Sequence, residues 1–262
     1  MTQHSSPTLS CYIRAKNEAR MIGDVVRAAL QAADEVIVID SDSTDGTAQI
    51  AKQAGAKVVR HDWLGNGHQK RVGEDACASD WLLDLDADEI ITPALAAEIN
   101  ALFANGAPPC PIYRTPMAMV PAIGKPWRGF GGVVRHKLYD RRVARAPAHA
   151  AWDQFDLPTN IKVGQLNEPI LHHAFTGAEH LIDKLNRNSS TRARELEPKS
   201  MPLLILRIFF GLPFYVAKRY FLDGLFRGGV YGFAFSMMSG FGRWMRDVKM
   251  FERHKRSSGG DQ

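Results

Sequence analysis

Four acidic side chains lie within six residues of the run WLLDLDADEIITP: Asp84, Asp86, Asp88 and Glu89. They end an apolar stretch, 81–85, that we predict to be a strand. Carboxylates taken out of water need solvent, a cation or a shared proton, because an isolated buried charge is very costly. Asp86 and Asp88, spaced i, i+2 at a strand end, suit a hard divalent ion with oxygen ligands, either Mg²⁺ or Mn²⁺. The alternative is an acidic turn that caps the helix following it.

Three further apolar runs precede this strand and alternate with helical patterns. The runs cover 9–13, 35–39 and 57–60, and apolar residues at helical spacing predict helices over about 22–29 and 48–54 between them. The order β-α-β-α-β is typical of a doubly wound α/β unit, which binds its ligands at the carboxyl ends of the strands. The acids that follow the strands should therefore meet in one crevice.

Three motifs carry a resemblance to a known family: IRAKNEA, VIVIDSDSTDGT and DWLLDLDADE, in that order. The chain resembles the family 2 inverting glycosyltransferases with the GT-A fold, and most closely the bacterial lipopolysaccharide-core β-glucosyltransferase group. The match covers roughly residues 8–100 and continues more weakly through 137–142. The resemblance implies an α/β fold with a GT-A type doubly wound mixed sheet, followed by a helical C-terminal extension.

The same resemblance implies roles for individual residues. Asp86 and Asp88 would be the metal ligands, with Mg²⁺ or Mn²⁺ as cofactor. The nucleotide would be bound by a larger set: Arg14, Asn17, Glu18, Asp40, Ser41, Lys70, Arg71 and Asp86.

Parts of that set depart from the family pattern or have another explanation. Ser41 stands where many relatives carry a second Asp, and Arg14 stands where they often have Thr. Asp40 could instead cap the next helix through an Asx turn. Lys70 and Arg71 follow the Gly-rich turn 65–67, and such a turn entering a helix can hold phosphate; a solvated helix face is the alternative.

An inverting sugar transfer also needs a carboxylate that takes the proton of the acceptor hydroxyl. In the resembling group this base is the Glu of a Val-His-Glu triplet about eleven residues after an Arg-Arg pair. Here that register falls on Ala151-Trp152-Asp153, so Asp153 is the predicted base. Asp156 is the rival and His149 a weaker one, and a loop acid without a role is the remaining alternative.

Two other polar groups are candidates for contacts with substrate. His172 and His173 are neighbours on a predicted strand and so point to opposite faces, which leaves only one of them able to face the diphosphate or the metal. Lys184, Arg187 and Asn188 lie at helical spacing and could contact an anionic acceptor, or could form a solvated face.

The formal net charge of +5 is concentrated toward the C-terminus, where 184–256 is rich in Lys and Arg. A helix near the end has two distinct faces. The apolar face carries Phe241, Trp244, Met245, Val248 and Phe251. The opposite, basic face carries Arg243, Arg246, Lys249 and Arg253. This pattern is typical of a helix lying on an anionic membrane. Packing on its own domain or on a second subunit is the alternative.

Composition narrows the class of protein. Three scattered cysteines lack metal spacing, so we expect no disulfides and a reducing cytoplasm. The polar N-terminal run MTQHSSPTLS has no apolar stretch typical of a signal peptide. Neither a P-loop nor a G-x-G-x-x-G motif after a strand occurs, which removes the usual ATPase and dinucleotide-binding interpretations.

Together these features predict an inverting, metal-dependent hexosyltransferase. It would move a hexose, in the first instance glucose, from a UDP-sugar to a lipid-linked glycan such as lipopolysaccharide inner core, at the cytoplasmic face of the bacterial inner membrane. We expect a nucleotide-sugar part over 1–105, an acceptor part over 106–200, and a helical membrane-associating or dimerising element over 201–262. No nucleic-acid partner is expected, and a homo-oligomer stays open. So do a non-catalytic nucleotide-sugar-binding protein and a metal-dependent nucleotidyltransferase.

Overall fold

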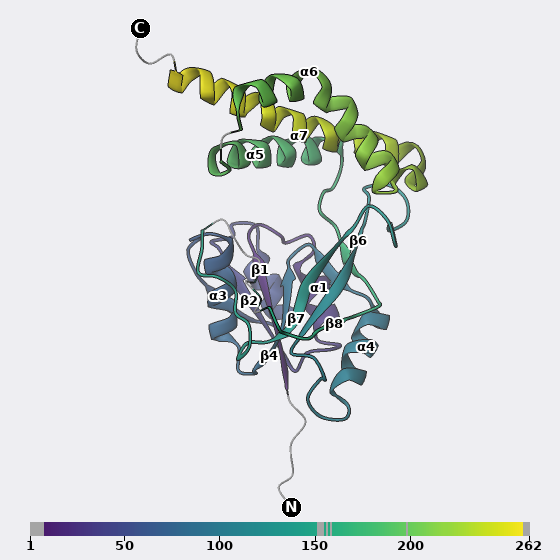
Figure 1. Ribbon diagram of the computed structural model, residues 1–262. Helices are drawn as coiled ribbons and strands as arrows, with labels where there is room; N and C mark the ends of the chain where they lie inside the picture. The colour runs from purple at the N-terminus through teal and green to yellow at the C-terminus, as the bar shows by residue number, and fades with distance from the viewer. Residues whose placement is uncertain (1–7, 151–154, 156, 158, 198, 259–262) are drawn as a thin grey trace, which may run out of the picture. The chain divides into compact units, whose positions relative to one another are not determined.

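The computed structural model describes residues 8–150, 155, 157, 159–197 and 199–258 (Figure 1). The chain divides into two compact units. The sheet unit comprises Met1–Ala118 and Val133–His172, and the helical unit comprises Met119–Gly132 and His173–Gln262.

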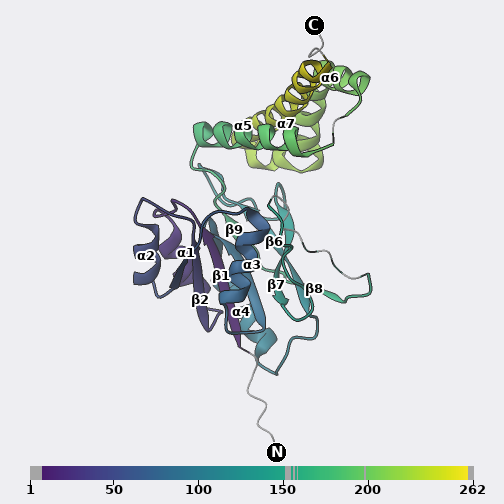
Figure 2. The same cartoon turned by 90° about the vertical axis from the view of Figure 1, so that its left-hand side faces the viewer.

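The sheet unit is built on one mixed sheet, with the strand order β3-β2-β1-β4-β7-β6-β9-β5 and with β8 paired to β6 (Figures 1 and 2). Strands β1 to β4 are parallel, and β7 is antiparallel to β4. The strand bounds are β1 Leu9–Ala15, β2 Glu35–Asp40, β3 Lys57–Arg60, β4 Trp81–Asp86, β5 Glu89–Ile91, β6 Ile112–Met119, β7 Val133–Asp140, β8 Val163–Gln165 and β9 Ile170–His172.

Helices cover both faces of this sheet, which confirms the predicted doubly wound α/β arrangement. Their bounds are α1 Ile22–Ala29, α2 Thr47–Gln53, α3 Asn66–Ala76 and α4 Pro93–Phe103. Alternate residues of β1 enter two different cores. Cys11 and Ile13 pack with α1, α2 and α4, whereas Tyr12 packs with Val72 of α3. Helix α3 lies very close to β1, because a Cβ on Gly73 would come 2.6 Å from the Tyr12 ring.

The helical unit consists mainly of three helices: α5 Ala178–Glu195, α6 Met201–Ala217 and α7 Gly229–Ser258. A π-helical turn η1 (Lys218–Leu222) and a 3-10 turn η2 (Leu225–Gly228) connect α6 to α7. Helix α7 packs along both α5 and α6 (Figures 1 and 2). Two glycines of α7 permit this, since a Cβ on Gly240 would come 2.6 Å from Val216, and one on Gly242 would come 2.9 Å from Leu185.

A single buried carboxylate joins α6, α7 and the segment between α5 and α6. Asp247 is fully buried and accepts hydrogen bonds from the Tyr215 hydroxyl at 2.6 Å and from Arg207 Nε at 3.0 Å. Lys199 Nζ lies 3.0 Å from its other oxygen, and Arg246 Nη2 lies 2.8 Å from it. Burial tends to raise the pKa of Asp247, but hydrogen bonds from Tyr215, Arg246 and Lys199 lower it below its ordinary value.

This packing engages the basic stripe that the sequence suggested for a membrane surface. Arg246 is buried against Asp247. Lys249 Nζ donates to the Asn186 side chain at 2.6 Å, and Arg253 Nη1 donates to the Ala193 carbonyl at 3.1 Å. These three cations therefore make contacts within the helical unit. This is the arrangement expected if the helix packs on its own domain.

Much of the exposed apolar surface of this unit lies on α6, and more lies on η1, η2 and the first half of α7. Within the described residues, one helical stretch, Met201–Leu222, is long and apolar enough to cross a membrane by length and composition. The helix continues through Pro213. Large apolar side chains stand exposed along it: Leu203, Leu206, Phe209, Phe210 and Phe214.

We expect Asp247→Ala to lower the free energy of unfolding by about 3 kcal/mol, because removing one partner of a buried ion pair leaves its cations unpaired. Urea unfolding followed by far-ultraviolet circular dichroism measures this. Glu252→Ala, at an exposed acid on the same helix, is the matched control and should change little. Equal unfolding curves for wild type and Asp247→Ala would contradict this role.

Candidate active site at the carboxyl edge of the sheet

The candidate catalytic residues come together on the face of the sheet that α3 covers. Side chains two apart on a strand share a face. Arg14 therefore follows Tyr12 onto the α3 face, and Asp84 and Asp86 lie on the same face of β4. In the parallel pairing of β1 and β4, Arg14 and Asp86 are register partners. Their side chains form an ion pair, which places a guanidinium directly beside the first carboxylate of the D-x-D motif.

Below this pair lies a buried network of charges. Asp84 is fully buried, and Lys70 Nζ of α3 reaches its carboxylate at 2.7 Å. Lys137 Nζ of β7 lies 3.9 Å from the same oxygen and 2.6 Å from Glu89 Oε2. Glu89 Oε2 in turn accepts a hydrogen bond from the Asp86 backbone N–H at 2.9 Å. The network thus fixes the turn that carries Asp86 and Asp88.

Burial and charge pairing together shift the pKa values of the acids in this network in opposite directions. Burial raises the pKa of Glu89 to about 7, despite the neighbouring Lys137. Burial disfavours the charged form of Lys137, but Asp84, Glu89 and Asp86 more than offset this and raise its pKa. Burial also acts to raise the pKa of Asp86, yet Arg14, Lys137 and Lys70 hold it well below its ordinary range. Asp86 is therefore an anion at every physiological pH.

A pocket of 240 Å³ opens above the network. Asp86 lines it together with His172, and the His172 Nε2 atom lies 3.5 Å from Asp88 Oδ2. The pairing of β5 with β9 places His172 opposite Glu89 and so brings it to this edge. Other lining residues are Lys70, Asp84, Glu89, Met117, Val133, Arg135, His136, Lys137 and Phe155.

The two acids of the D-x-D motif fit a divalent ion that is shared with a ligand. Among the described residues, no group of three His, Cys, Asp or Glu side chains forms a metal cage. Mg²⁺ and related ions commonly take only one or two protein carboxylates and complete their shell with phosphate oxygens and water. The partly exposed Asp86 and the neighbouring Asp88 provide that number of ligands.

The loops after β1 and β2 are tied together at the same edge of the sheet. Asn17 Oδ1 accepts a hydrogen bond from the Thr44 backbone N–H at 2.9 Å, and the Glu18 backbone N–H donates to Thr47 Oγ1 at 2.8 Å. Asn17 and Asp42 have positive φ values of 55° and 54°. Asn17 and Glu18 therefore shape the entrance loop through these bonds.

Asp40, at the end of β2, keeps one oxygen available. Its Oδ2 accepts from the Ser43 backbone N–H at 3.3 Å, in the manner of the turn-capping alternative. Its Oδ1 is buried and has no hydrogen-bond partner in the described part of the chain, which indicates a missing donor. The adjacent Ser41 accepts a hydrogen bond from Gln69 Nε2 at 2.7 Å and so anchors this loop to α3.

The beginning of α3 is occupied by the chain itself. The Asn66 and Gly67 backbone N–H groups donate to the carbonyls of Ala150 and His149, at 2.8 and 3.0 Å. Gly65 has φ of 116°, and a Cβ there would come 2.2 Å from the Ala150 carbonyl oxygen, so only glycine fits. These N–H groups are not available to a phosphate, contrary to what the Gly-rich turn suggested.

The two cations that follow this turn have protein partners. Lys70 pairs with Asp84 in the buried network. The Arg71 guanidinium donates to the Ala146 carbonyl. Lys70 still lines the pocket, whereas the contact of Arg71 holds the loop after β7 against α3.

The predicted base, Asp153, and its rival Asp156 lie outside the described residues. The nearest described residues before and after it are Ala150 and Phe155. Ala150 is bonded to α3 as above, and Phe155 lines the pocket and packs on Tyr139 with ring centroids 4.6 Å apart. His149, the weaker candidate, has an exposed side chain.

Sequence reasoning missed Lys137 as a member of the site. The signal was a lysine in a run, VVRHKLYD, whose end is apolar and buried. A lysine in such a position needs a buried carboxylate partner, and the acid cluster of β4 was the only candidate on an adjacent strand among the described residues.

Comparisons with known proteins agree with this geometry. The model of the family described as Glycosyl transferase family 2 matches residues 10–141. An uncharacterized glycosyltransferase of Rickettsia felis is 32% identical over 253 residues, which cover 93% of this chain and 89% of that protein. The lipopolysaccharide core biosynthesis glycosyltransferase LpsC of Rhizobium meliloti is 26% identical over 263 residues, covering 94% and 93%.

Among solved structures, S. aureus TarS 1-349 in complex with UDP-GlcNAc has a similar fold, with a TM-score of 0.50. It is 15% identical in sequence, and the match covers 95% of this chain and 92% of that one. At this identity the likeness concerns the fold alone.

We expect Lys137→Met to lower the free energy of unfolding by about 3 kcal/mol, because it leaves buried Asp84 and Glu89 without a shared cation. The difference in the free energy of unfolding between wild type and Lys137→Met should grow above pH 7. A carboxyl with a raised folded pKa contributes stability below its unfolded pKa of about 4.3 and loses it as pH rises through the folded value. In wild type, the decrease in stability with pH ends near the folded pKa of Glu89, about 7. Without Lys137 the folded pKa of Glu89 is higher, so the variant continues to lose stability at higher pH.

Urea unfolding at a series of pH values from about 6 to about 9 measures this. Lys162→Met, at an exposed lysine of the same unit, is the control and should show no pH-dependent difference. A difference between wild type and Lys137→Met that shrinks as pH rises would contradict the pairing.

Proposed function

The chain is a family 2 glycosyltransferase with the GT-A fold, and from that premise we propose that it is an inverting enzyme that uses a UDP-sugar as donor. We propose a hexose, in the first instance glucose, as the transferred sugar. The acceptor in this proposal is a lipid-linked glycan such as lipopolysaccharide inner core. The observation that carries the proposal is Asp86, which lines the pocket and is held by the buried network, with Asp88 beside His172.

The donor would bind along the carboxyl edge of β1, β2 and β4. Asp40 would accept a hydrogen bond from the nucleoside through its unpartnered Oδ1. Asp86 and Asp88 would hold Mg²⁺ or Mn²⁺, which neutralises the charge of the leaving diphosphate when bound. Arg14 and Lys70 add positive charge beside Asp86. Asn17, Glu18, Ser41 and Arg71 would position the surrounding loops through the bonds described above.

The reaction itself would be a single displacement at the anomeric carbon. Asp153 would take the proton of the acceptor hydroxyl as its oxygen forms the new glycosidic bond, and the nucleotide diphosphate would leave from the opposite face. The support is that Ala150 and Phe155, on either side of Asp153 in the sequence, both lie at this site. His172 stands beside Asp88, where it would orient that carboxylate.

The acceptor class rests on two observations. The relative LpsC bears a name in lipopolysaccharide core biosynthesis and aligns over 94% of this chain. In addition, α6 presents an exposed apolar face, which suits a protein working on a membrane-bound substrate. We therefore propose peripheral binding to the inner face of the bacterial inner membrane, with 1–105 handling the donor, 106–200 the acceptor, and 201–262 the membrane or a second subunit.

The donor and the metal can be tested together. Purified protein with a panel of UDP-sugars and Mn²⁺ or Mg²⁺ should release UDP, with UDP-glucose the best donor, and a chelator should stop the release. Asp88→Asn should abolish it, because it removes one anionic ligand for a hard cation. Asp24→Asn, at an exposed acid of α1, is the control and should behave as wild type. Metal-dependent turnover that survives in Asp88→Asn would remove the metal assignment.

The base has its own test. Asp153→Asn should lower kcat about 100-fold or more, in line with general-base contributions, and leave KM for the donor nearly unchanged. Asp156→Asn is the matched control and should keep most of the activity. A large loss in Asp156→Asn with little loss in Asp153→Asn would move the base to the other residue.

Membrane binding is tested on α6 rather than by truncating α7, since truncation would remove Asp247 and its contacts. Phe209→Ser with Phe210→Ser should reduce co-sedimentation with anionic liposomes, because both side chains are exposed on the apolar face. Leu64→Ser with Ile123→Ser, at exposed apolar residues elsewhere, should sediment as wild type. If the α6 variant sediments with liposomes as wild type does, this face does not bind the membrane, and contact with a second subunit becomes the remaining explanation for it.

A further inference from the structure

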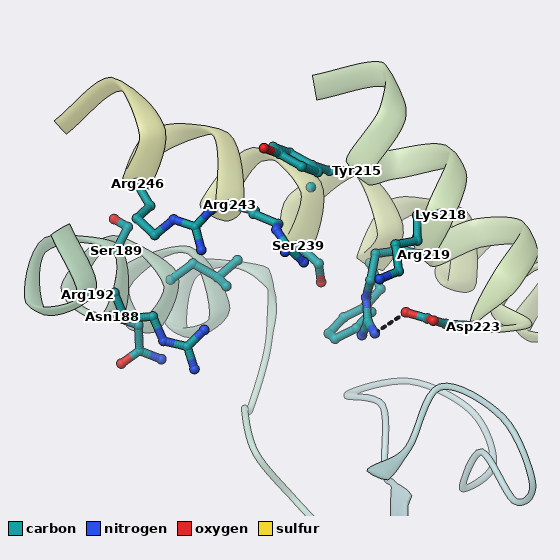
Figure 3. A pocket seen from close by; sticks show the side chains of 14 residues that line it. Asn188, Ser189, Arg192, Tyr215, Lys218, Arg219, Asp223, Ser239, Arg243 and Arg246 are labelled. Carbon is teal, nitrogen blue, oxygen red and sulfur yellow. Dashed lines mark hydrogen bonds and ion pairs between the residues drawn. The ribbon is translucent and has the colours of Figure 1, made fainter. Parts of the chain in front are cut away.

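The helical unit contains a cationic pocket of its own, with a volume of 550 Å³ (Figure 3). It shares no lining residue with the pocket of the sheet unit. Its walls come from α5, from the end of α6 with η1, and from α7. Five basic side chains line it against one carboxylate, that of Asp223: Arg192, Lys218, Arg219, Arg243 and Arg246.

Two of these cations are already neutralised. Arg219 Nη1 lies 2.6 Å from Asp223 Oδ2, the contact drawn in Figure 3. Arg246 is paired with the buried Asp247. These two cations are therefore held by ion pairs within the pocket wall.

The other three cations have no carboxylate partner in the part of the chain that the structure describes. Arg192 projects from α5, Lys218 begins η1, and Arg243 lies with its guanidinium 5.0 Å from the centre of the Tyr215 ring. They come from three different elements around one hollow, in which positive charge is in excess; Figure 3 shows Arg243 between Arg192 at one end and Lys218 at the other. Such an arrangement favours an anionic ligand, because repulsion among the cations is relieved when it binds.

The remaining lining residues suit a polar ligand of moderate size. Asn188 and Ser239 contribute an amide and a hydroxyl, and Ser239 points into the pocket in Figure 3. Tyr215 and Phe235 provide flat apolar surface. Arginine side chains bind phosphate oxygens through paired N–H donors, and 550 Å³ is in the range of pockets that enclose a small ligand.

We propose that this pocket binds a phosphate monoester, with Arg192 and Arg243 holding the phosphate and the tyrosine side of the pocket contacting the group that carries it. A phosphorylated sugar and the headgroup of phosphatidic acid share this chemistry. The proposal goes beyond the donor site and does not depend on which sugar that site transfers.

Calorimetric titration of the full chain at physiological salt tests the binding. The probes are glucose 6-phosphate, glucose as the uncharged comparison, and vesicles containing phosphatidic acid or, at equal amount, phosphatidylglycerol, whose phosphate is a diester. We expect binding of a monoester probe and none of glucose. Binding of the soluble sugar phosphate identifies a phosphosugar site, and a preference for phosphatidic acid vesicles alone identifies a headgroup site.

The decisive variant is Arg192→Gln with Arg243→Gln, two exposed residues whose replacement leaves the buried Asp247 contacts intact. It should weaken monoester binding about tenfold or more, since each charged hydrogen bond contributes on the order of a decade in affinity. Arg194→Gln with Arg256→Gln is the matched control: it removes the same charge from exposed positions of α5 and α7 outside the pocket. It should bind as wild type.

Three results would overturn the proposal: no binding of any monoester probe by wild type, unchanged affinity in the Arg192 and Arg243 variant, or an equal loss in the control. Release of UDP from the donor alone is measured in the same preparations. It should be unchanged in both variants, so a failure of the proposed transferase activity and a failure of this pocket are seen separately.

Discussion

Asp84 is fully buried beneath the sheet-unit pocket, where Lys70 reaches it at 2.7 Å and Lys137 approaches at 3.9 Å. None of these charges could remain ionised there alone, because the loss of hydration would exceed any other gain. Their pairing joins α3, β4 and β7 at one point. Through Glu89 it also reaches the backbone of Asp86, so the position of the D-x-D turn depends on it.

Buried charges also need partners of opposite charge in the helical unit. Asp247 accepts contacts from Lys199, Arg207, Tyr215 and Arg246, so a single acid fixes how α6 and α7 pack. Basic residues outnumber the acids available to them in this unit. Those left over line the 550 Å³ pocket, and this surplus of positive charge is the reason that an anion suits it.

Close backbone approach is the second determinant of the candidate active site. Gly65 lets the Ala150 carbonyl reach the start of α3, which brings the chain next to the predicted base into the neighbourhood of Arg14 and Asp86. A side chain at position 65 would clash there. Positive φ values at Asn17 and Asp42 shape the loops after β1 and β2 in a comparable way. The site is thus assembled from loops held by specific local geometry on a rigid sheet.

The sequence by itself determined the α/β alternation, the bounds of β1 to β4 to within a few residues, and the D-x-D turn, because hydrophobic periodicity and turn residues are local signals. It did not reveal Lys137 as a buried partner or the engagement of Arg246, Lys249 and Arg253 by the helical unit. The order of β4, β7 and β6 and the packing of α5 on α7 decide which charges meet. These are contacts between residues far apart in the chain, and a charge pattern read along one helix cannot distinguish a face that meets a membrane from one that meets another helix.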